Sequence, residues 1–241
     1  MGLSHSPTIV TDGLVLCLDA ANSRSYPGAG TTWTDLKGGN NGTLTNGPTF
    51  DTANVGSVAF DGVDDYVEVS PSSQTNLSGG NFTISSWFYL PLSVDTTNTY
   101  YNIFAIGNTS LGSNVFYLSV WRSGLNPGCL YSRINNVTLL GTDNSGTGYV
   151  GNYYKVSGKW VNICFVEDNG TSIMYINGNI NGSRTTPTIP SSDNYITLGR
   201  MAQYSLLSPP SLLFSSFILY NKPLTISEVR QNYLATKGRY E

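Results

Sequence analysis

The sequence predicts an all-β protein, an antiparallel β-sandwich that ends in one short α-helix. Short segments of alternating apolar and polar residues recur along the chain, as in half-buried strands. Turn signals such as Asn177-Gly178, the strongest type for a hairpin, separate these segments. Charged residues make up only 11% of the 241 residues. An uncharged polar surface of this kind is expected where many strands meet many turns.

The first half of the chain supplies the clearest strand patterns. Leu14–Asp19 is a compact apolar run. Asp61-Gly62 stands between two alternating segments, and it predicts a tight turn that joins a pair of strands. In the segment 82–90, one face carries Phe82, Ile84, Phe88 and Leu90, and the other carries Trp87 and Tyr89. Because both faces hold aromatic residues, we expect this strand at the centre of the sandwich.

Further strands are expected at residues 103–106, 115–121, 160–166, 173–176, 195–200 and 214–220. The segments 160–166 and 173–176 predict a hairpin, joined by the turn at Glu167–Gly170. Cys17 and Cys164 lie within apolar strand runs, so we expect buried free thiols, which suit a reducing cytoplasm.

One helix is predicted near the end of the chain. Thr225 is the expected N-cap, with Glu228 at the third helical position and Leu224 placed to pack on Val229. The expected apolar stripe is Ile226, Val229, Tyr233 and Leu234, and Gly238 is the expected stop. The helix is expected to act as a lid docked on the edge of the sandwich.

The composition of the chain and the order of its segments limit the domain organisation and the partners that can be expected. Without a linker, repeat or low-complexity block, residues 1–241 are expected to form a single domain, with residues 1–10 as an extended N-terminal arm. Residues 1–10 have neither a basic start nor an apolar core, so no signal peptide or membrane partner is expected. The net charge is −3, and the 12 Lys and Arg are scattered, which argues against nucleic acid.

Asp61, Asp64 and Asp65 place three carboxylates within five residues of a chain that is otherwise poor in charge. Two interpretations are open. The carboxylates form an oxygen cluster of the type that binds calcium, or they shape the turn and keep the end of a strand soluble.

Several of these segments, taken in order, resemble the laminin-G-like, concanavalin A-like jelly-roll family. The resembling segments are Phe60–Val67, Phe82–Trp87, Lys159–Val161, Asp168–Gly178, Leu198–Arg200 and Tyr220–Val229. The resemblance implies a jelly-roll sandwich over nearly the whole chain. It also implies an Asp-Glu pair, a frequent second part of the family's calcium site, where this chain has Ser215-Ser216. This departure favours the turn role over metal for Asp61 and Asp64, so no cofactor is expected.

The ends of the chain resemble stand-alone proteins of this kind that tailed bacteriophages encode. The resembling segments are residues 4–16, 19–22, 26–28, 231–233 and 237–240. The resemblance implies a non-enzymatic virion protein, either a capsid decoration or a component of the tail or fibre. Its partners would be other virion proteins, with weak adhesion to host-surface glycan. The alternative is a carbohydrate-binding module similar to lectins, with or without calcium.

Exposed aromatic side chains would suit a glycan. The candidates in turn-like segments are Tyr100, Tyr101, Tyr149, Tyr153 and Tyr154. Their alternative role is to cover sheet edges or to form a homo-oligomer interface. The four tryptophans, Trp33, Trp87, Trp121 and Trp160, are expected to lie mostly in the core.

No catalytic constellation is found in the sequence. Glucanases with this fold resemble one another in a Glu-x-Asp-x-x-Glu strand, and none of the four glutamates belongs to such a pattern. A hydrolase would need Glu68 or Glu167 paired with a distant aspartate. The single histidine, His5, stands beside no candidate nucleophile. The chain is therefore not expected to be an enzyme.

Overall fold

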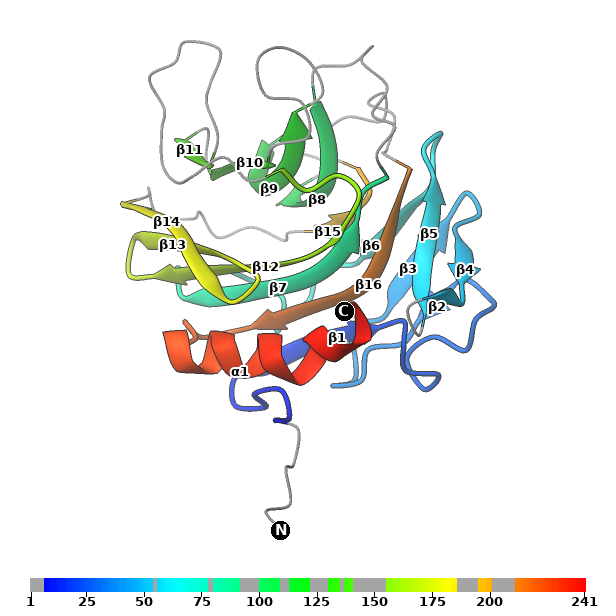
Figure 1. The fold of residues 1–241 in the computed structure, drawn as a ribbon, viewed down its shortest axis with the longest axis horizontal. Helices are drawn as coiled ribbons and strands as arrows, with labels where there is room; N and C mark the ends of the chain where they lie inside the picture. Colours follow the sequence, from blue (N-terminus) through cyan, green and yellow to red (C-terminus); the bar gives the residue numbers. More distant parts are fainter. Residues whose placement is uncertain are drawn as a thin grey trace.

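The computed structural model describes residues 7–53, 56–77, 80–91, 100–108, 113–121, 130–134, 137–140, 155–185, 195–200 and 211–241. Within these ranges the chain forms two antiparallel sheets packed face to face, and one α-helix crosses the outer face of the first sheet (Figure 1). The predicted fold class, an antiparallel sandwich with a C-terminal helix, is confirmed.

The described part of the first sheet contains eight strands. They are β1 (Leu14–Asp19), β4 (Thr49–Asp51), β5 (Ser57–Asp61), β7 (Phe82–Tyr89), β12 (Trp160–Asp168), β13 (Thr171–Ile176), β14 (Asn179–Thr185) and β16 (Ser211–Tyr220). Their order is β14-β13-β12-β7-β16-β5-β4, and β1 also pairs with β16. β16 therefore has β7 along one side, and β5 and then β1 along the other.

The described part of the second sheet also contains eight strands. They are β2 (Thr32–Trp33), β3 (Gly42–Thr45), β6 (Tyr66–Val69), β8 (Tyr100–Asn108), β9 (Ser113–Trp121), β10 (Leu130–Ile134), β11 (Val137–Leu140) and β15 (Tyr195–Leu198). Their order is β11-β10-β9-β8-β15-β6-β3-β2.

The alternation predicted for residues 82–90 is confirmed. Phe82, Ile84 and Phe88 lie in the core cluster between the sheets, whereas Trp87 packs on the outer side against the helix region. β7 lies between β12 and β16, which is the expected central position. Aromatic contacts join the two sheets across the core. Phe116 of β9 stacks on Phe165 of β12 with 4.4 Å between ring centroids.

The tight turn predicted at Asp61-Gly62 does not form a hairpin. β5 belongs to the first sheet and β6 to the second, so residues 62–65 form a corner between the two sheets. The alternation of each strand was read correctly, but a turn signal does not specify which strands pair. Gly62 has φ +87°, and a Cβ there would lie 2.9 Å from the Ser211 nitrogen. The corner therefore requires glycine at this position.

Asn177-Gly178, in contrast, forms the predicted hairpin turn between β13 and β14. Both residues have positive φ, +49° and +72°, as a type I′ turn requires. A Cβ at Gly178 would also lie 2.9 Å from the ring of Tyr233 in the helix. The turn and the helix are thus in close contact.

The helix α1 (Ile226–Thr236) begins with the predicted capping box between Thr225 and Glu228. Of the predicted apolar stripe, Val229 is buried and Tyr233 is partly buried, but the prediction is wrong for Ile226 and Leu234, which are 48% and 51% exposed. The other buried positions of the helix are Asn232 and Thr236. Asn232 and Thr236 bond polar groups of the sheet, Tyr220 and Trp87. The expectation that the helix docks on the edge of the sandwich is wrong, because the helix lies over the face of the first sheet. A 3-10 helix, Lys237–Arg239, follows it.

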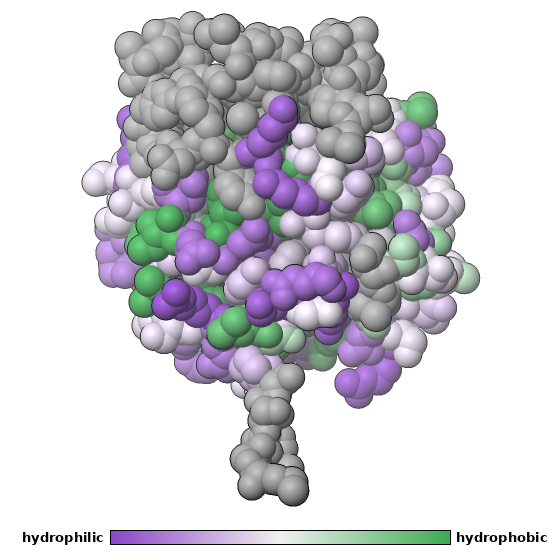
Figure 2. All heavy atoms as spheres, in the orientation of Figure 1, coloured by the Kyte–Doolittle hydropathy of each residue, from purple (hydrophilic) through white to green (hydrophobic). Residues whose placement is uncertain are grey.

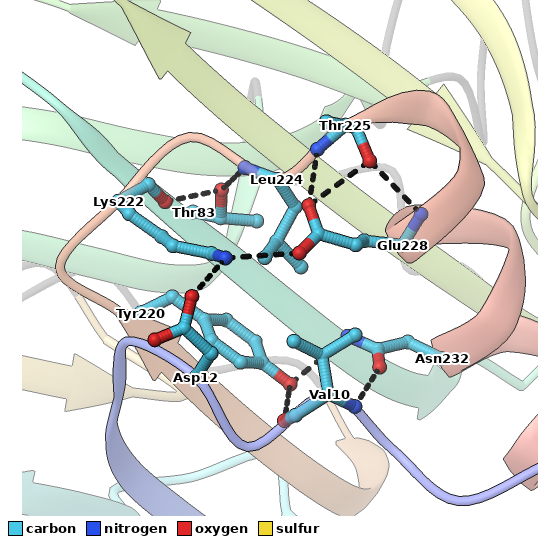
Figure 3. A network of polar contacts seen from close by, with 9 residues as sticks. All are labelled: Val10, Asp12, Thr83, Tyr220, Lys222, Leu224, Thr225, Glu228 and Asn232. Atoms are coloured by element: carbon cyan, nitrogen blue, oxygen red, sulfur yellow. Dashed lines mark hydrogen bonds and ion pairs between the residues drawn. The ribbon is translucent and has the colours of Figure 1, made fainter.

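Polar contacts tie the N-terminal arm to this helix (Figure 3). The Val10 N–H donates to Asn232 Oδ1 at 2.8 Å. The Tyr220 hydroxyl donates to the Val10 carbonyl at 3.0 Å and accepts from Asn232 Nδ2 at 2.9 Å. All three residues are buried, so the arm joins the packed body at Val10. Burial also raises the pKa of the Tyr220 hydroxyl, which remains a neutral donor.

A second apolar cluster fills the space between the first sheet and the helix. It includes Cys17 and Cys164, which are buried free thiols as predicted. Burial, followed by the charges of Asp19 and Asp35, raises the pKa of Cys17 to about 12. These thiols are therefore unreactive packing groups at neutral pH.

The face that carries α1 is a patchwork of polar and apolar residues. In the coloured part of Figure 2, apolar residues lie in small groups separated by polar ones. The described residues contain no helix that has the length and apolar character needed to span a membrane.

The Tyr220 network makes a stability prediction. Tyr220→Phe removes a hydroxyl with two buried partners, so the free energy of unfolding is expected to fall by about 1–3 kcal/mol. Urea denaturation measures this loss. The matched control is Gln231→Ala, since Gln231 Nε2 joins the same arm at the Thr8 carbonyl in an exposed position. A loss for Tyr220→Phe no larger than that for Gln231→Ala would contradict the prediction.

Candidate functional site

The tyrosines predicted to bind glycan cannot be assigned a site. Tyr149, Tyr153 and Tyr154 lie outside the described residues. Tyr100 and Tyr101 lie in strand β8, not in the expected turn, and their side chains are outside the description. Their role in binding stays a prediction.

An open hollow lies on the outer face of the first sheet, where β12, β7 and β16 run side by side. Its floor is a row of neighbours across three strands, because Tyr89 pairs with Trp160 on one side and with Leu213 on the other. Gly158, Lys159 and Tyr240 complete its lining, and its volume is about 480 Å³. The size suits one or two small rings.

Three partly exposed aromatic side chains surround this hollow, which we call the aromatic hollow. The rings of Tyr89 and Trp160 have centroids 5.8 Å apart. Tyr240 lies 4.8 Å from Trp160 and stacks on the buried Trp87 at 4.1 Å. The hollow thus offers aromatic surface from two strands and from the end of the chain.

Polar contacts fix Tyr240 in this position. Its hydroxyl donates to Ser215 Oγ at 2.7 Å. The preceding residue, Arg239, forms two hydrogen bonds of 2.9 and 3.0 Å with the carboxylate of Asp19 at the end of β1. Trp87 Nε1 donates to Thr236 Oγ1 at 2.8 Å, which holds the end of α1 nearby. The aromatic hollow is therefore complete only when the C-terminal segment is docked.

The sequence predicted part of the aromatic hollow. The alternation in 82–90 placed Trp87 and Tyr89 together on the outer face, which the structure confirms. Trp160 was expected in the core, but it is only partly buried and lines the hollow. Trp33 and Trp87 are buried as expected, and the Trp121 side chain lies outside the description. No local pattern could place Tyr240, which reaches the hollow through tertiary contacts.

A second hollow of about 520 Å³ lies at the other end of β16, beside the start of β1. Its lining is Leu14, Val15, Lys37, Gly38, Ser73, Gln74, Asn76 and Asn221. We call it the amide hollow, because none of these residues is aromatic and three carry side-chain amides.

The three acidic residues form a cluster, the acidic corner, between β5 and β6. One carboxylate oxygen each from Asp61, Asp64 and Asp65 lies within 4.8 Å of the others. Asp61 Oδ1 accepts from the Val63 N–H at 2.8 Å, and Asp65 Oδ2 accepts from the Asp61 N–H at 2.9 Å. These bonds show that two of the carboxylates shape the corner. Burial, with the charges of Asp61 and Asp64, raises the pKa of Asp65 against the lowering effect of the Asp61 N–H.

Ser215-Ser216 does not face the acidic corner. Ser211 pairs with Asp61, and Ser215 lies four residues farther along, about 13 Å at the usual strand rise. Ser215 Oγ donates to the Gly56 carbonyl and accepts from Tyr240. Ser215-Ser216 therefore lies away from the acidic corner, and the expectation that Asp61 and Asp64 bind no metal stays a prediction.

The two glutamates considered for hydrolysis are already engaged in the fold. Glu68 of β6 forms an ion pair with Arg200 at 3.0 Å. Glu167 of β12 is 2% exposed and accepts a hydrogen bond from Ser172 Oγ. The two residues lie in different sheets. The absence of enzymatic activity stays a prediction.

Solved structures of other proteins have a similar fold. The sialidase of Trypanosoma rangeli, in complex with the inhibitor DANA, matches 99% of this chain with TM-score 0.69 and 14% identity. The ligand binding domain of botulinum neurotoxin serotype D, in complex with N-acetylneuraminic acid, matches 92% with TM-score 0.66 and 16% identity. The binding domain of Paraclostridial Mosquitocidal Protein 1 matches 92% with TM-score 0.67 and 18% identity.

This chain spans 36%, 50% and 52% of those three chains. Because the identities are 14–18%, the likeness concerns the fold alone. No curated protein matches the sequence. The family model Laminin_G_3, described as the concanavalin A-like lectin/glucanases superfamily, matches residues 61–230. The chain therefore belongs to this family of concanavalin A-like domains.

Proposed function

We propose that the protein is a carbohydrate-binding module and that the aromatic hollow is its binding site. The observation that carries the proposal is the cross-strand row at the floor of the hollow, in which Tyr89 lies between Trp160 and Leu213 with Tyr240 beside it. A sugar ring has an apolar C–H face and polar edges. Partly exposed aromatic rings in a shallow site suit such a ligand, because they bury the apolar face and leave the hydroxyls to polar groups.

The lining of the aromatic hollow favours binding over hydrolysis. None of the six described lining residues is a carboxylate, and the single charged side chain is Lys159. Most glycoside hydrolases need two carboxylates across the scissile bond. The aromatic hollow therefore has surface for recognition without the acid and base for this reaction.

The comparisons support the same class of ligand. The botulinum neurotoxin domain is described in complex with N-acetylneuraminic acid, and the Trypanosoma rangeli sialidase in complex with sialic acid. Both share the fold of this chain at low identity. They support a saccharide as the ligand class, without specifying which saccharide this chain binds.

A role in a virion is a separate proposal, which rests on the resemblance of the chain ends to phage-encoded proteins. A glycan-binding module would serve adhesion in such a particle. Mass spectrometry of purified particles would detect the chain if it is a virion component, and particles without it would contradict this role.

The proposed site leads to a prediction about the glycan affinity when an aromatic residue of its floor is removed. Trp160→Ala is expected to weaken glycan binding about tenfold or more, because truncating a large aromatic side chain at the centre of a contact commonly costs about 2 kcal/mol. A glycan array identifies the ligand, and titration calorimetry with that ligand measures the affinity. Gln74→Ala, in the amide hollow, is the matched control and is expected to keep the affinity of the unaltered protein.

Folding of each variant is checked by thermal unfolding, so that a lost affinity is not a lost fold. An unchanged affinity in Trp160→Ala, or an equal loss in Gln74→Ala, would show that the glycan does not bind in the aromatic hollow. If the unaltered protein binds no neutral or acidic glycan on the array, that result would contradict the proposed function itself.

The C-terminal contacts make a further prediction. Arg239→Ala breaks the pair with Asp19 and is expected to weaken glycan binding several-fold, because Tyr240 loses its fixed position. In a Tyr240→Ala background, the same change is expected to have little further effect on affinity, since Arg239 acts through Tyr240. Equal losses in both backgrounds would show that Arg239 does not act by positioning Tyr240. Titration calorimetry of the four proteins completes this cycle.

A further inference from the structure

We propose that Asn232 and Thr236 of α1 are positioning residues for the aromatic hollow, and that through them glycan binding depends on the docked N-terminal arm. The inference rests on the proposed function, because glycan affinity is the property that these residues alter. It is carried by a series of hydrogen bonds that leads from Val10 of the arm through α1 to Trp87, the ring on which Tyr240 stacks.

Trp87 is the buried support of Tyr240. The two rings stack with centroids 4.1 Å apart and 24° between their planes, and only 5% of Trp87 is exposed. Tyr240 is one of the aromatic residues that line the hollow. The ion pair of Arg239 with Asp19 holds the backbone beside it, whereas the indole supports the ring. The orientation of the Trp87 indole therefore sets the position of one wall of the hollow.

One hydrogen bond fixes the orientation of this indole. Trp87 Nε1 donates to Thr236 Oγ1 at 2.8 Å, and both residues are buried. An indole N–H is a donor only, so it needs the acceptor that this hydroxyl supplies. The hydroxyl donates in turn to the Asn232 carbonyl at 2.9 Å, one helical turn earlier in α1. Thr236 thus joins the Trp87 ring to the backbone of the helix.

The side chain of Asn232 connects the same helix to the arm (Figure 3). Its Oδ1 accepts the Val10 N–H at 2.8 Å, and its Nδ2 donates to the Tyr220 hydroxyl at 2.9 Å. The Tyr220 hydroxyl closes the group by donating to the Val10 carbonyl. Displacement of Val10 would therefore remove one of the buried bonds that set the position of α1 over the sheet.

The apolar contacts of α1 are too few to fix its position without these bonds. In α1, all of whose residues are described, Val229 is the one buried apolar residue, and the other two buried residues are Asn232 and Thr236. Apolar burial has no preferred direction, whereas a hydrogen bond weakens steeply when it is misaligned. Because the 3-10 helix Lys237–Arg239 follows α1 directly, the polar bonds of α1 also set the position of Tyr240.

The first test compares three threonine variants of the full chain by titration calorimetry with the glycan found on the array. Thr236→Val keeps the shape of the side chain and removes the hydroxyl, so the affinity is expected to fall about three- to tenfold. Thr236→Ser restores the hydroxyl and is expected to recover most of the affinity. Thr83→Val is the matched control, because its hydroxyl bonds Lys222 and Leu224 just before the other end of α1. It is expected to lower the melting temperature and to keep the affinity.

The indole N–H signal of Trp87 gives a second readout, which needs no ligand. In ¹H–¹⁵N NMR spectra, where Trp87→Phe assigns the signal, Thr236→Val is expected to shift it and to speed its exchange with solvent. Thr83→Val is expected to leave it unchanged. Val10→Pro removes the N–H that Asn232 accepts, and it is expected to shift the same signal and to weaken glycan binding. Asn232→Ala removes this bond from the helix side and replaces Val10→Pro if that variant does not fold.

The combined variant decides whether the arm acts through α1. In a Thr236→Val background, Val10→Pro is expected to cause little further loss of affinity. A full additional loss would overturn the dependence on the arm. An unchanged Trp87 signal in Thr236→Val, or an equal loss of affinity in Thr83→Val, would overturn the positioning role. If the Trp87 signal responds as expected while Trp160→Ala keeps its affinity, the coupling from the arm to Trp87 is supported and the proposed glycan site is contradicted.

Discussion

The structure depends on strand β16, because the aromatic hollow, the acidic corner and the contacts of the N-terminal arm all adjoin it. β7 pairs along one side of this strand, and β5 and β1 divide the other side between them. The division occurs at a break in register between Phe214 and Ser216. Before the break Leu212 and Phe214 face the core, and after it Phe217 and Leu219 do. The irregularity thus lets one strand keep its apolar side inward while it changes partners.

Four positions along β16 hold the features that lie on the outer side of the first sheet. Ser211 pairs with the residue that begins the acidic corner, and Leu213 lies on the floor of the aromatic hollow. Ser215 receives the hydroxyl of Tyr240, and Tyr220 binds the N-terminal arm and α1. Elements from both ends of the chain are therefore positioned by one central strand. These long-range contacts hold the described residues near Val10 and Tyr240 against the first sheet.

The sequence predicted the parts of the fold that local physics determines. The alternation in β7, the Asn177-Gly178 turn and the capping box of α1 depend on neighbours within a few residues, and all three are confirmed. The prediction that Asp61-Gly62 joins two paired strands was wrong, because the choice of strand partner is a tertiary property. The stripe on α1 was wrong at Ile226 and Leu234 for a related reason. The helix docks through Asn232 and Thr236, whose partners Tyr220 and Trp87 lie far away in sequence.

The aromatic hollow was likewise predictable from the sequence only in part, and it lies close to the acidic corner. Alternation could place Tyr89 and Trp87 on one outer face, but the third wall needs Tyr240, which the pair of Arg239 with Asp19 brings across the sheet. Ser211 and Leu213 are two residues apart, about 7 Å along the strand. The acidic corner and the aromatic hollow therefore share the first residues of β16. A rigid aromatic floor loses less entropy when a ligand binds to it, so the contacts that hold β16 in the sheet favour binding in the hollow.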